Sequence, residues 1–336
     1  MALADIEKQY DLMNEACELL QAKLQDDCLD ALIENFDNLL NDGKVHVEDG
    51  IPDEETASKL AEIYRAVHLD EISTEDRRLL LQLSLLTAYR KEKIQANHQM
   101  TPDSIGFLTA YLLQQVYEKK DETNFLDLCI GTGNLAAVII NALKNNGFKN
   151  IHGFGIDNDD TLLTIASIES QLCDLDLNLY HQDALDKSLI PQADVIVSDL
   201  PVGWYPLDER AEGYETHAKE GHSFVHFLLI EQALDNLKEG GIGMFLIPSS
   251  MFESKESLPL LKFIQKNGYL QSLINLPGAM FASKKSEKAI LILQKKAGAK
   301  SKQANPVLLG EFPLVKDTKN FEKFMAEVAV WKEKNF

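Results

Sequence analysis

The sequence has few cysteines and no long apolar segment. Its 336 residues include only Cys17, Cys28, Cys129 and Cys173, and no two of these form a C-x-x-C pair. Such scattered cysteines indicate neither a zinc site nor a disulfide framework, so we expect reduced and mostly buried thiols and no bound metal. No apolar run approaches the length of a membrane span, and Met1–Asp5 has no basic residue. We therefore expect a cytoplasmic protein without a secretory signal.

Positive charge is also scarce. Lysine and arginine number 33 against 53 acidic residues, which gives a net charge of -20. An acidic protein repels phosphate backbones, which argues against tight nucleic-acid binding by this chain alone. The one basic cluster comprises Lys284, Lys285, Lys288, Lys295, Lys296, Lys300 and Lys302. It is either a nucleic-acid edge or a solvated hairpin, and a partner subunit would be another way to hold nucleic acid. The sequence leaves the oligomeric state open.

The first 97 residues predict a helical N-terminal domain. Apolar residues recur there at helical spacing, as in Ile6, Tyr10, Met13, Cys17 and Leu20. Breaks at Asn41–Gly43 and Gly50–Pro52 separate the helices, and Pro52 with the acids after it is typical of a first helical turn.

Residues 98–336 predict an α/β domain. Thr101-Pro102 is typical of a helix start, with threonine as the cap and proline at the first helical position. Short apolar runs then alternate with amphipathic stretches, which favours a mostly parallel sheet with helices on both faces. The expected strands are 125–129, 152–156, 177–180, 195–198, 243–247, 270–276 and 289–293. No clear helix separates the last two, so we expect them to pair antiparallel.

A glycine loop follows the first expected strand. Gly131-x-Gly133-x-x-Ala136 fits a nucleotide-binding turn, where glycines let a ligand approach the backbone and the next helix offers free N–H groups. Asp157, after the second strand, is placed to accept the hydroxyls of a ribose. Asp127, before the loop, would repel the pyrophosphate of NAD but attract an ammonium group. Asp183, after the third strand, is placed to accept from an adenine amino group. The pattern thus favours S-adenosylmethionine and disfavours an NAD-dependent dehydrogenase.

The stretch D-L-C-I-G-T-G-N-L resembles the cofactor loop of class I S-adenosylmethionine-dependent methyltransferases. Met100-Thr101-Pro102 and the two late segments, 276–281 and 288–293, resemble adenine-N6 DNA methylases in particular. That group includes modification subunits of type I restriction systems, and the resemblance covers nearly the whole chain. The resemblance implies a Rossmann-like methyltransferase sheet with a helical N-terminal domain. It also implies the cofactor-binding residues Thr101, Asp127, Gly131, Thr132, Gly133, Asn134, Leu135, Asp157, Asn158, Asp183 and Ala184.

The resemblance places the catalytic tetrapeptide, N/D-P-P-Y/F in that family, at Asp199-Leu200-Pro201-Val202. An aspartate side chain and the next carbonyl accept the two N–H bonds of an amino group and aim its lone pair, so that positioning supplies most of the rate. Asp199 and Pro201 fit this pattern, whereas Val202 lacks the aromatic ring that stacks on a flipped base. Trp204 and Tyr205 lie nearby, either to stack on a substrate or to pack the loop.

Two functions remain open from the sequence. One is N-methylation of an amino nitrogen in a nucleobase or similar group, and the other is a cofactor-binding interaction or regulatory protein with a degenerate tetrapeptide. His222 and His226, four residues apart, lack the glutamate of a zinc motif, and we expect them to be exposed or helix-capping. The polar stretch 213–222 is either a substrate lid or an ordinary surface loop.

Overall fold

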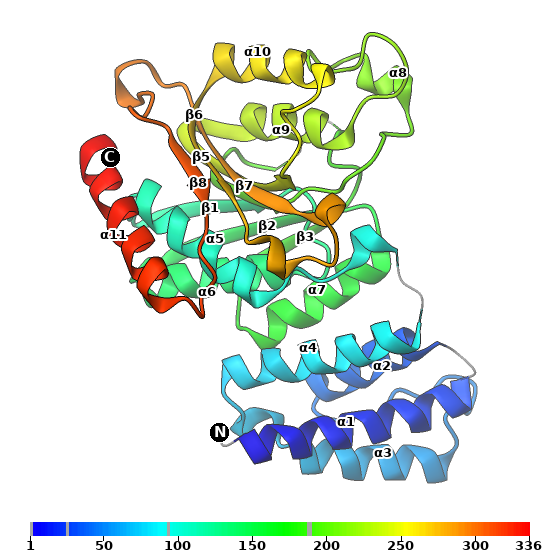
Figure 1. Ribbon diagram of the computed structural model, residues 1–336. Helices are drawn as coiled ribbons and strands as arrows, with labels where there is room; N and C mark the ends of the chain where they lie inside the picture. Colours follow the sequence, from blue (N-terminus) through cyan, green and yellow to red (C-terminus); the bar gives the residue numbers. More distant parts are fainter. Residues whose placement is uncertain (1–2, 25–26, 93–94, 187–189) are drawn as a thin grey trace. The chain divides into compact units, whose positions relative to one another are not determined.

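The computed structural model describes residues 3–24, 27–92, 95–186 and 190–336 (Figure 1). Met1 and Ala2, part of the segment in which we expect no secretory signal, lie outside the described residues. Contacts divide the chain into two compact units. The first comprises Met1–Gln99, Gly131–Gly133 and Asp160–Leu175, and the second comprises Met100–Ile130, Asn134–Asp159 and Asp176–Phe336. Every helix in the described residues is too short or too polar to cross a lipid bilayer.

The first unit is helical, as its sequence periodicity predicts. It contains α1 (Leu3–Leu24), α2 (Cys28–Leu40), α3 (Glu54–Val67), η1 (Leu69–Glu71), α4 (Thr74–Lys91), η2 (Ala96–His98) and α7 (Asp160–Leu172). Side chains cap three of these helices: Asp27 for α2, Asp53 for α3 and Ser73 for α4. The first turn of α3 therefore begins one residue after the Asp53 cap, and Pro52 precedes the cap rather than opening the helix.

Helix α1 packs against α2, α3 and α4, and α7 packs against α2 and α4. A buried polar group lies among the apolar side chains, because Tyr64 donates to Asn35 Oδ1 at 2.8 Å and Asn38 donates to Tyr64. Helix α7 falls within residues 98–336, the segment expected to form the second domain, yet its contacts group it with the first unit. The domain boundary at residue 97 stays a prediction.

The second unit is built on one eight-stranded sheet. Its strands are β1 (Glu122–Asp127), β2 (Asn150–Asp157), β3 (Leu177–His181), β4 (Ala193–Asp199), β5 (Leu237–Pro248), β6 (Gly268–Asn275), β7 (Lys288–Lys295) and β8 (Leu308–Glu311). Their order is β3-β2-β1-β4-β5-β7-β6-β8. All neighbours pair in parallel except β7, which runs antiparallel to both β5 and β6. The mostly parallel sheet with a late antiparallel strand is thus confirmed.

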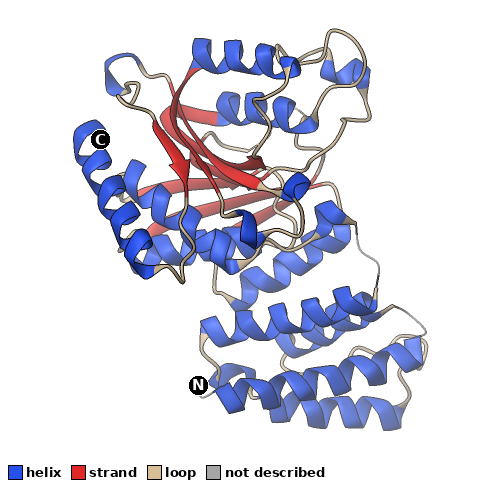
Figure 2. Cartoon of the chain, in the orientation of Figure 1, coloured by secondary structure: helices blue, strands red, loops and turns tan. Residues whose placement is uncertain are grey.

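Helices cover both faces of this sheet (Figure 2). They are α5 (Asp103–Val116), α6 (Asn134–Asn145), α8 (Asp208–Ala211), α9 (Val225–Asn236), α10 (Leu258–Asn267) and α11 (Thr318–Asn335), with short turns η3 (Lys255–Ser257), η4 (Gly278–Met280), η5 (Lys284–Ser286) and η6 (Gly298–Lys300). Helices α9 and α10 lie on one face, and α5, α6 and α11 lie on the other. Thr101 is not the cap of α5, because the helix begins at Asp103 and Pro102 takes the cap position.

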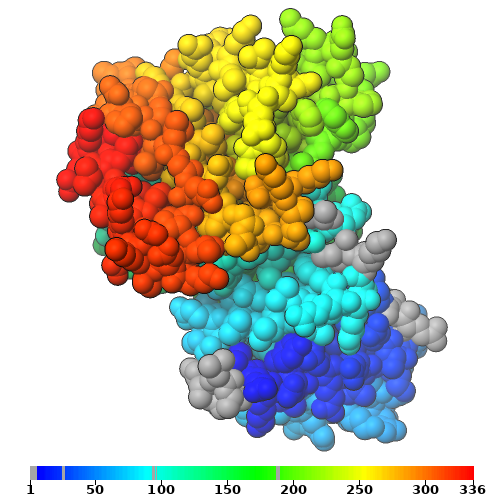
Figure 3. All heavy atoms as spheres, viewed as in Figure 1, coloured from blue at the N-terminus to red at the C-terminus, as the bar shows by residue number. Residues whose placement is uncertain are grey.

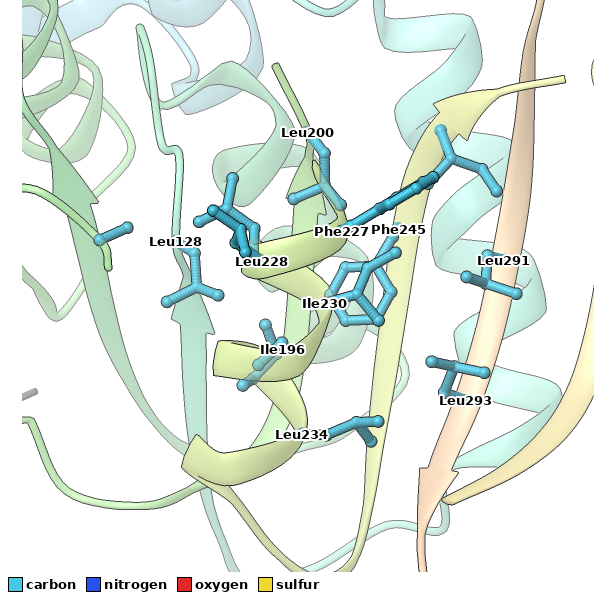
Figure 4. Close-up of a cluster of buried hydrophobic side chains, with 14 of the residues drawn as sticks. Leu128, Ile196, Leu200, Phe227, Leu228, Ile230, Leu234, Phe245, Leu291 and Leu293 are labelled. Carbon is cyan, nitrogen blue, oxygen red and sulfur yellow. The ribbon is translucent and has the colours of Figure 1, made fainter. Parts of the chain in front are cut away.

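The centre of the sheet packs against α9 (Figure 4). Ile196 on β4, Phe245 on β5 and Leu291 on β7 are each at most 1% exposed and belong to one buried cluster with Leu228 and Ile230 of the helix. Complete burial of such a side chain contributes about 1.5–3 kcal/mol. The cluster fixes the carboxyl end of β4 against the first turn of α9, where the tetrapeptide lies.

Candidate functional site

The predicted carboxylates gather at the carboxyl ends of the central strands. In the sheet register, Asp127 at the end of β1 lies opposite Gly155, and Asp157 ends β2 opposite His181. Asp199 ends β4 opposite Leu246. Ligands of open α/β sheets bind at this edge, close to the point where strand order reverses between β1 and β4. The structure therefore brings these three acids to one edge of the sheet.

Asp127 is almost completely enclosed, with 1% of its surface exposed. Its Oδ1 accepts the N–H of Cys129 at 3.0 Å, and the Ser198 hydroxyl also donates to it. The pKa of Asp127 is raised to about 7, mainly by burial and in smaller part by the charges of Asp157 and Asp199, while the two hydrogen bonds lower it. The carboxyl group shapes the turn after β1, and a contact with a ligand ammonium stays a prediction.

The next two predicted acids have protein partners of their own. Asp157 accepts the N–H of Asp159 at 3.1 Å, and Asn158 between them is exposed. Asp183 accepts the N–H of Leu185 at 2.9 Å on one oxygen, and the other oxygen accepts from Tyr205 and Arg210.

A carboxylate has about four acceptor sites, and Asp183 already accepts three hydrogen bonds, so its contact with an adenine amino group stays a prediction. Ala184, after Asp183, is 9% exposed.

The glycine loop turns through backbone conformations that favour glycine. Gly131 has φ of +54° and Gly133 has φ of +82°. A side chain on Gly133 would come within 3.2 Å of the Ala166 backbone, whereas Gly131 has open space where a Cβ would lie. Gly131, buried Thr132 and Gly133 group with the first unit by their contacts, and the residues on either side group with the second.

The residues that flank the loop are firmly held. The N–H of Ile130 donates to the carbonyl of Ile156 at 2.9 Å. Asn134 opens α6, and its amide donates to the Thr101 carbonyl at 2.7 Å and to Asp103 at 3.1 Å. Leu135 is buried at 4% exposure. The start of α5 and the start of α6 are therefore joined at the predicted cofactor edge.

Asp199 is held on both of its oxygens. Thr101 Oγ1 donates to Oδ2 at 2.8 Å, and Lys288 Nζ forms an ion pair with Oδ1. The side chains of Lys288 and Asp199 are 26% and 20% exposed. Lys288 reaches the site because it opens β7, which pairs antiparallel with the end of β5. Thr101, expected to cap a helix, instead donates to the predicted catalytic acid, and its contact with a cofactor stays a prediction.

The rest of the tetrapeptide is anchored by backbone contacts. Leu200 is 1% exposed and its N–H donates to the Leu246 carbonyl at 3.1 Å. Pro201 is hydrogen-bonded through its backbone to His226, whereas Val202 is 47% exposed. His226 is 4% exposed, and burial lowers its pKa to about 4. The expectation of an exposed or capping His226 was therefore wrong: it is a neutral buried ring under the loop.

The two nearby aromatic residues differ in role. Tyr205 is 4% exposed, and its hydroxyl donates to Asp183 Oδ2 at 2.7 Å, so it packs the loop. Trp204 is 57% exposed, and one face of its ring stacks on Phe224 with centroids 3.9 Å apart. Trp204 thus presents an indole ring, already stiffened by a neighbour, beside the exposed Val202.

The stretch 213–222 is anchored to α9. Buried Glu231 accepts the N–H groups of Glu215 at 2.9 Å and Thr216 at 2.8 Å. Tyr214 donates to the carbonyl of Leu185 at 2.8 Å. These contacts favour an ordinary fixed loop over a lid. His222 pairs with Asp208 at 2.9 Å, and no group of three potential metal ligands occurs in the described part of the chain.

The basic cluster of the sequence is divided by the length of β7. Lys288 lies at the start of the strand with Asp199, and exposed Lys284 and Lys285 precede it in η5. At the other end, Lys295 and Lys296 donate to backbone carbonyls of α9, β5 and α10. Only the first group lies at the edge that carries the predicted site.

A family model for N-6 DNA methylases matches residues 84–327, and a model for the YtxK N-terminal helical domain matches residues 7–89. The chain belongs to the N-6 DNA methylase family. It is 35% identical to the uncharacterised protein YtxK of Bacillus subtilis over 325 residues, which is 97% of each chain. By family and fold it is a methyltransferase of the S-adenosylmethionine-dependent kind.

Solved structures agree with this family. A candidate class I S-adenosylmethionine-dependent methyltransferase from Listeria monocytogenes superposes with a TM-score of 0.90 at 38% identity, covering 98% of this chain and all of that one. A methyltransferase subunit of a type I restriction-modification system from Streptococcus thermophilus has a TM-score of 0.62 at 13% identity, covering 89% of this chain and 70% of that one. The second likeness shows the shared fold alone.

Proposed function

We propose that the chain transfers a methyl group from S-adenosylmethionine to an amino nitrogen of a nucleobase or a similar group. The observation that carries this proposal is Asp199, a carboxylate at the end of β4 held at a partly exposed position by Thr101 and Lys288. Leu200 and Pro201 follow it in an anchored backbone. A rigid acceptor of this kind orients an amino group for attack.

The chemistry of the predicted residues fits the cofactor. S-adenosylmethionine, when bound, supplies a methyl group on a positively charged sulfur. The acids at the strand ends suit a cationic ligand, and Asp157 is placed to accept ribose hydroxyls. Gly131 has open space where a side chain would lie. From the family resemblance we assign to cofactor binding the residues Thr101, Asp127, Gly131, Thr132, Gly133, Asn134, Leu135, Asp157, Asn158, Asp183 and Ala184.

Substrate binding would involve Trp204 rather than Tyr205. The exposed face of Trp204 supplies the aromatic surface that Val202 lacks, and base–aromatic stacking is worth about 1–3 kcal/mol per base. The net charge of -20 disfavours DNA binding by this chain alone, so a nucleic-acid substrate would require a partner subunit. We place the reaction in the cytoplasm.

Methyl transfer into fractionated cell extract tests this function. S-adenosylmethionine with a tritiated methyl group is incubated with the protein and with separated DNA, RNA, protein and small-molecule fractions. We expect label in a fraction that contains nucleobases, retained by Asp199→Asn and reduced about 100-fold or more by Asp199→Ala. Asparagine keeps an acceptor oxygen, so loss in both variants alike would contradict the role given to this side chain.

A second function is favoured by the same carboxylate. Both oxygens of Asp199 already hold a protein donor, and Val202 replaces the aromatic residue of the tetrapeptide. A cofactor-binding interaction protein with little catalysis would have such a site. Cofactor binding without label in any fraction would favour this alternative.

A further inference from the structure

Lys288 donates to the atom that the proposed reaction requires. An amino group oriented by Asp199 must donate an N–H to a carboxylate oxygen, and Lys288 Nζ already donates to Oδ1. Thr101 Oγ1 occupies Oδ2 from the other side at 2.8 Å. Lys288 therefore presents to Asp199 the same kind of donor, a nitrogen with N–H bonds, that an acceptor amine would present.

We propose that Lys288 is the specificity residue of the methyl-acceptor site: it pairs with Asp199 until an amine takes its place, and then pairs with a phosphate of the same acceptor molecule. The inference rests on the proposed function, because it assumes that Asp199 receives an amino group. It adds a chemical class, an amine that carries a phosphate within reach of β7.

The need for an anion follows from the burial of the pair. Lys288 is 26% exposed and Asp199 is 20% exposed, so separating them leaves a poorly hydrated ammonium. An unpaired, partly buried charge is unfavourable unless a new partner compensates it. An uncharged acceptor offers no such partner, and a cationic one, such as a lysine side chain, repels Lys288. A phosphate group accepts its hydrogen bonds, and lysine is a common phosphate ligand.

The surroundings of Lys288 support an anionic acceptor. Lys284 and Lys285 precede it in η5, and residues 282–286 are exposed. This loop between β6 and β7 lies at the surface of the molecule (Figure 3). In a chain of net charge -20, three lysines within five residues beside the predicted acceptor form a local exception to the acidic character.

The test compares two probes that differ only in a phosphate. Adenosine 5′-monophosphate and adenosine are each titrated by calorimetry into the full chain saturated with S-adenosylhomocysteine. We expect the monophosphate to bind wild type about tenfold more tightly or better, since a charge-assisted contact is added. Lys288→Arg should keep this preference, and Lys288→Met should remove it.

Two further variants separate ion-pair exchange from general charge. Lys296→Met removes the same charge just beyond the other end of β7 and should keep the preference. Asp199→Asn should strengthen monophosphate binding, because the carboxylate that competes for Lys288 is gone. The double variant Asp199→Asn with Lys288→Met should lose that gain. If the double variant binds the monophosphate with the same gain as Asp199→Asn, the proposed exchange of partners by Lys288 is wrong.

The remaining outcomes are equally decisive. Equal binding of both probes by wild type, binding of neither probe, or a preference that survives in Lys288→Met contradicts the proposal. S-adenosylhomocysteine is titrated first, so its failure to bind is seen separately and refutes the proposed function itself. A deoxyadenylate hexamer serves as a third probe. If the hexamer binds more tightly than the monophosphate and Lys288→Met removes that difference, the phosphate belongs to a nucleic acid. Otherwise the acceptor is a mononucleotide.

Discussion

Asp127 is a carboxyl group in surroundings that favour its protonated form. Burial raises its pKa to about 7, with contributions from the charges of Asp157 and Asp199. Such a group binds a proton in the folded chain at pH values where the unfolded chain has released it. The stability of the fold therefore falls as pH rises from about 4 to about 7, and the penalty stays in full above that range.

Replacement of Asp127 by asparagine should remove this dependence. Asparagine keeps the oxygen that accepts the Cys129 N–H but carries no charge. We expect the difference in free energy of unfolding between Asp127→Asn and wild type to shift by about 2–3 kcal/mol in favour of the variant between pH 5 and pH 8. Urea denaturation at both pH values measures this difference. A constant difference between the two proteins would show that Asp127 is ionised throughout.

Trp204 and Tyr205 should respond differently to truncation. Tyr205 is buried and donates to Asp183, so Tyr205→Ala should lower the free energy of unfolding by about 3 kcal/mol. Trp204 is largely exposed and loses mainly its stacking on Phe224, about 1 kcal/mol. Thermal or urea unfolding of both variants checks the order. A larger loss for Trp204→Ala would mean that its ring packs the loop and is not available to a substrate.

The pair formed by Asp199 and Lys288 shows which part of the site could be predicted from the sequence and which part could not. Asp199 could be predicted because a strand pattern and a tetrapeptide mark it locally. Its partner Lys288 lies 89 residues away, and only the register of β7 against β5 brings the two together. The sequence showed Lys288 as part of a basic cluster, which predicts exposure rather than an ion pair.

At the scale of elements, α9 organises the substrate side of the site. His226, in its first turn, is hydrogen-bonded to the backbone of Pro201 in the tetrapeptide. Glu231, five residues later in the same helix, accepts the N–H groups of residues 215 and 216. Hydrogen bonds to a charged group are stronger than neutral ones, so the two bonds to Glu231 add strongly to the anchor that Tyr214 makes with Leu185.

Loss of Glu231 should release the loop. Glu231→Ala removes both acceptors, and hydrogen bonds to charged groups contribute about 1.5–3 kcal/mol each. We expect trypsin to cleave the native variant after the exposed Lys219 at least tenfold faster than wild type. Cleavage at Lys255, also exposed but preceding α10, is the internal control. Equal acceleration at both sites would indicate general destabilisation instead.

Strand β8 shows why one element was missed. Its four residues, Leu308–Glu311, include a glycine, follow Pro306 and lie at the edge of the sheet, mostly exposed. A short exposed edge strand lacks the apolar alternation by which strands are recognised. The six central strands contain buried apolar runs that allowed each to be predicted, though Cys129 lies beyond the end of β1. Strand β3, at the opposite edge, has no buried residue, but the apolar-polar alternation from Leu177 to Leu179 still marked it.

At the scale of the whole molecule, the order of strands decides what the site is. The sequence predicts which acids follow which strands, and only the order β3-β2-β1-β4 brings the ends of β1, β2 and β4 to neighbouring positions. Parallel strands present all their carboxyl ends at one edge. The antiparallel β7 then adds Lys288 to that edge from its amino end.

The central claim is that these strand ends bind S-adenosylmethionine, and calorimetric titration with S-adenosylhomocysteine tests it most directly. We expect saturable binding by wild type, weakened about tenfold or more by Asp157→Ala, which removes the predicted acceptor of the ribose hydroxyls. Asp176→Ala removes an acid beside the opposite end of β3, where it pairs with His152, and should bind as wild type does. No binding by wild type, or equal weakening by both variants, would contradict the account.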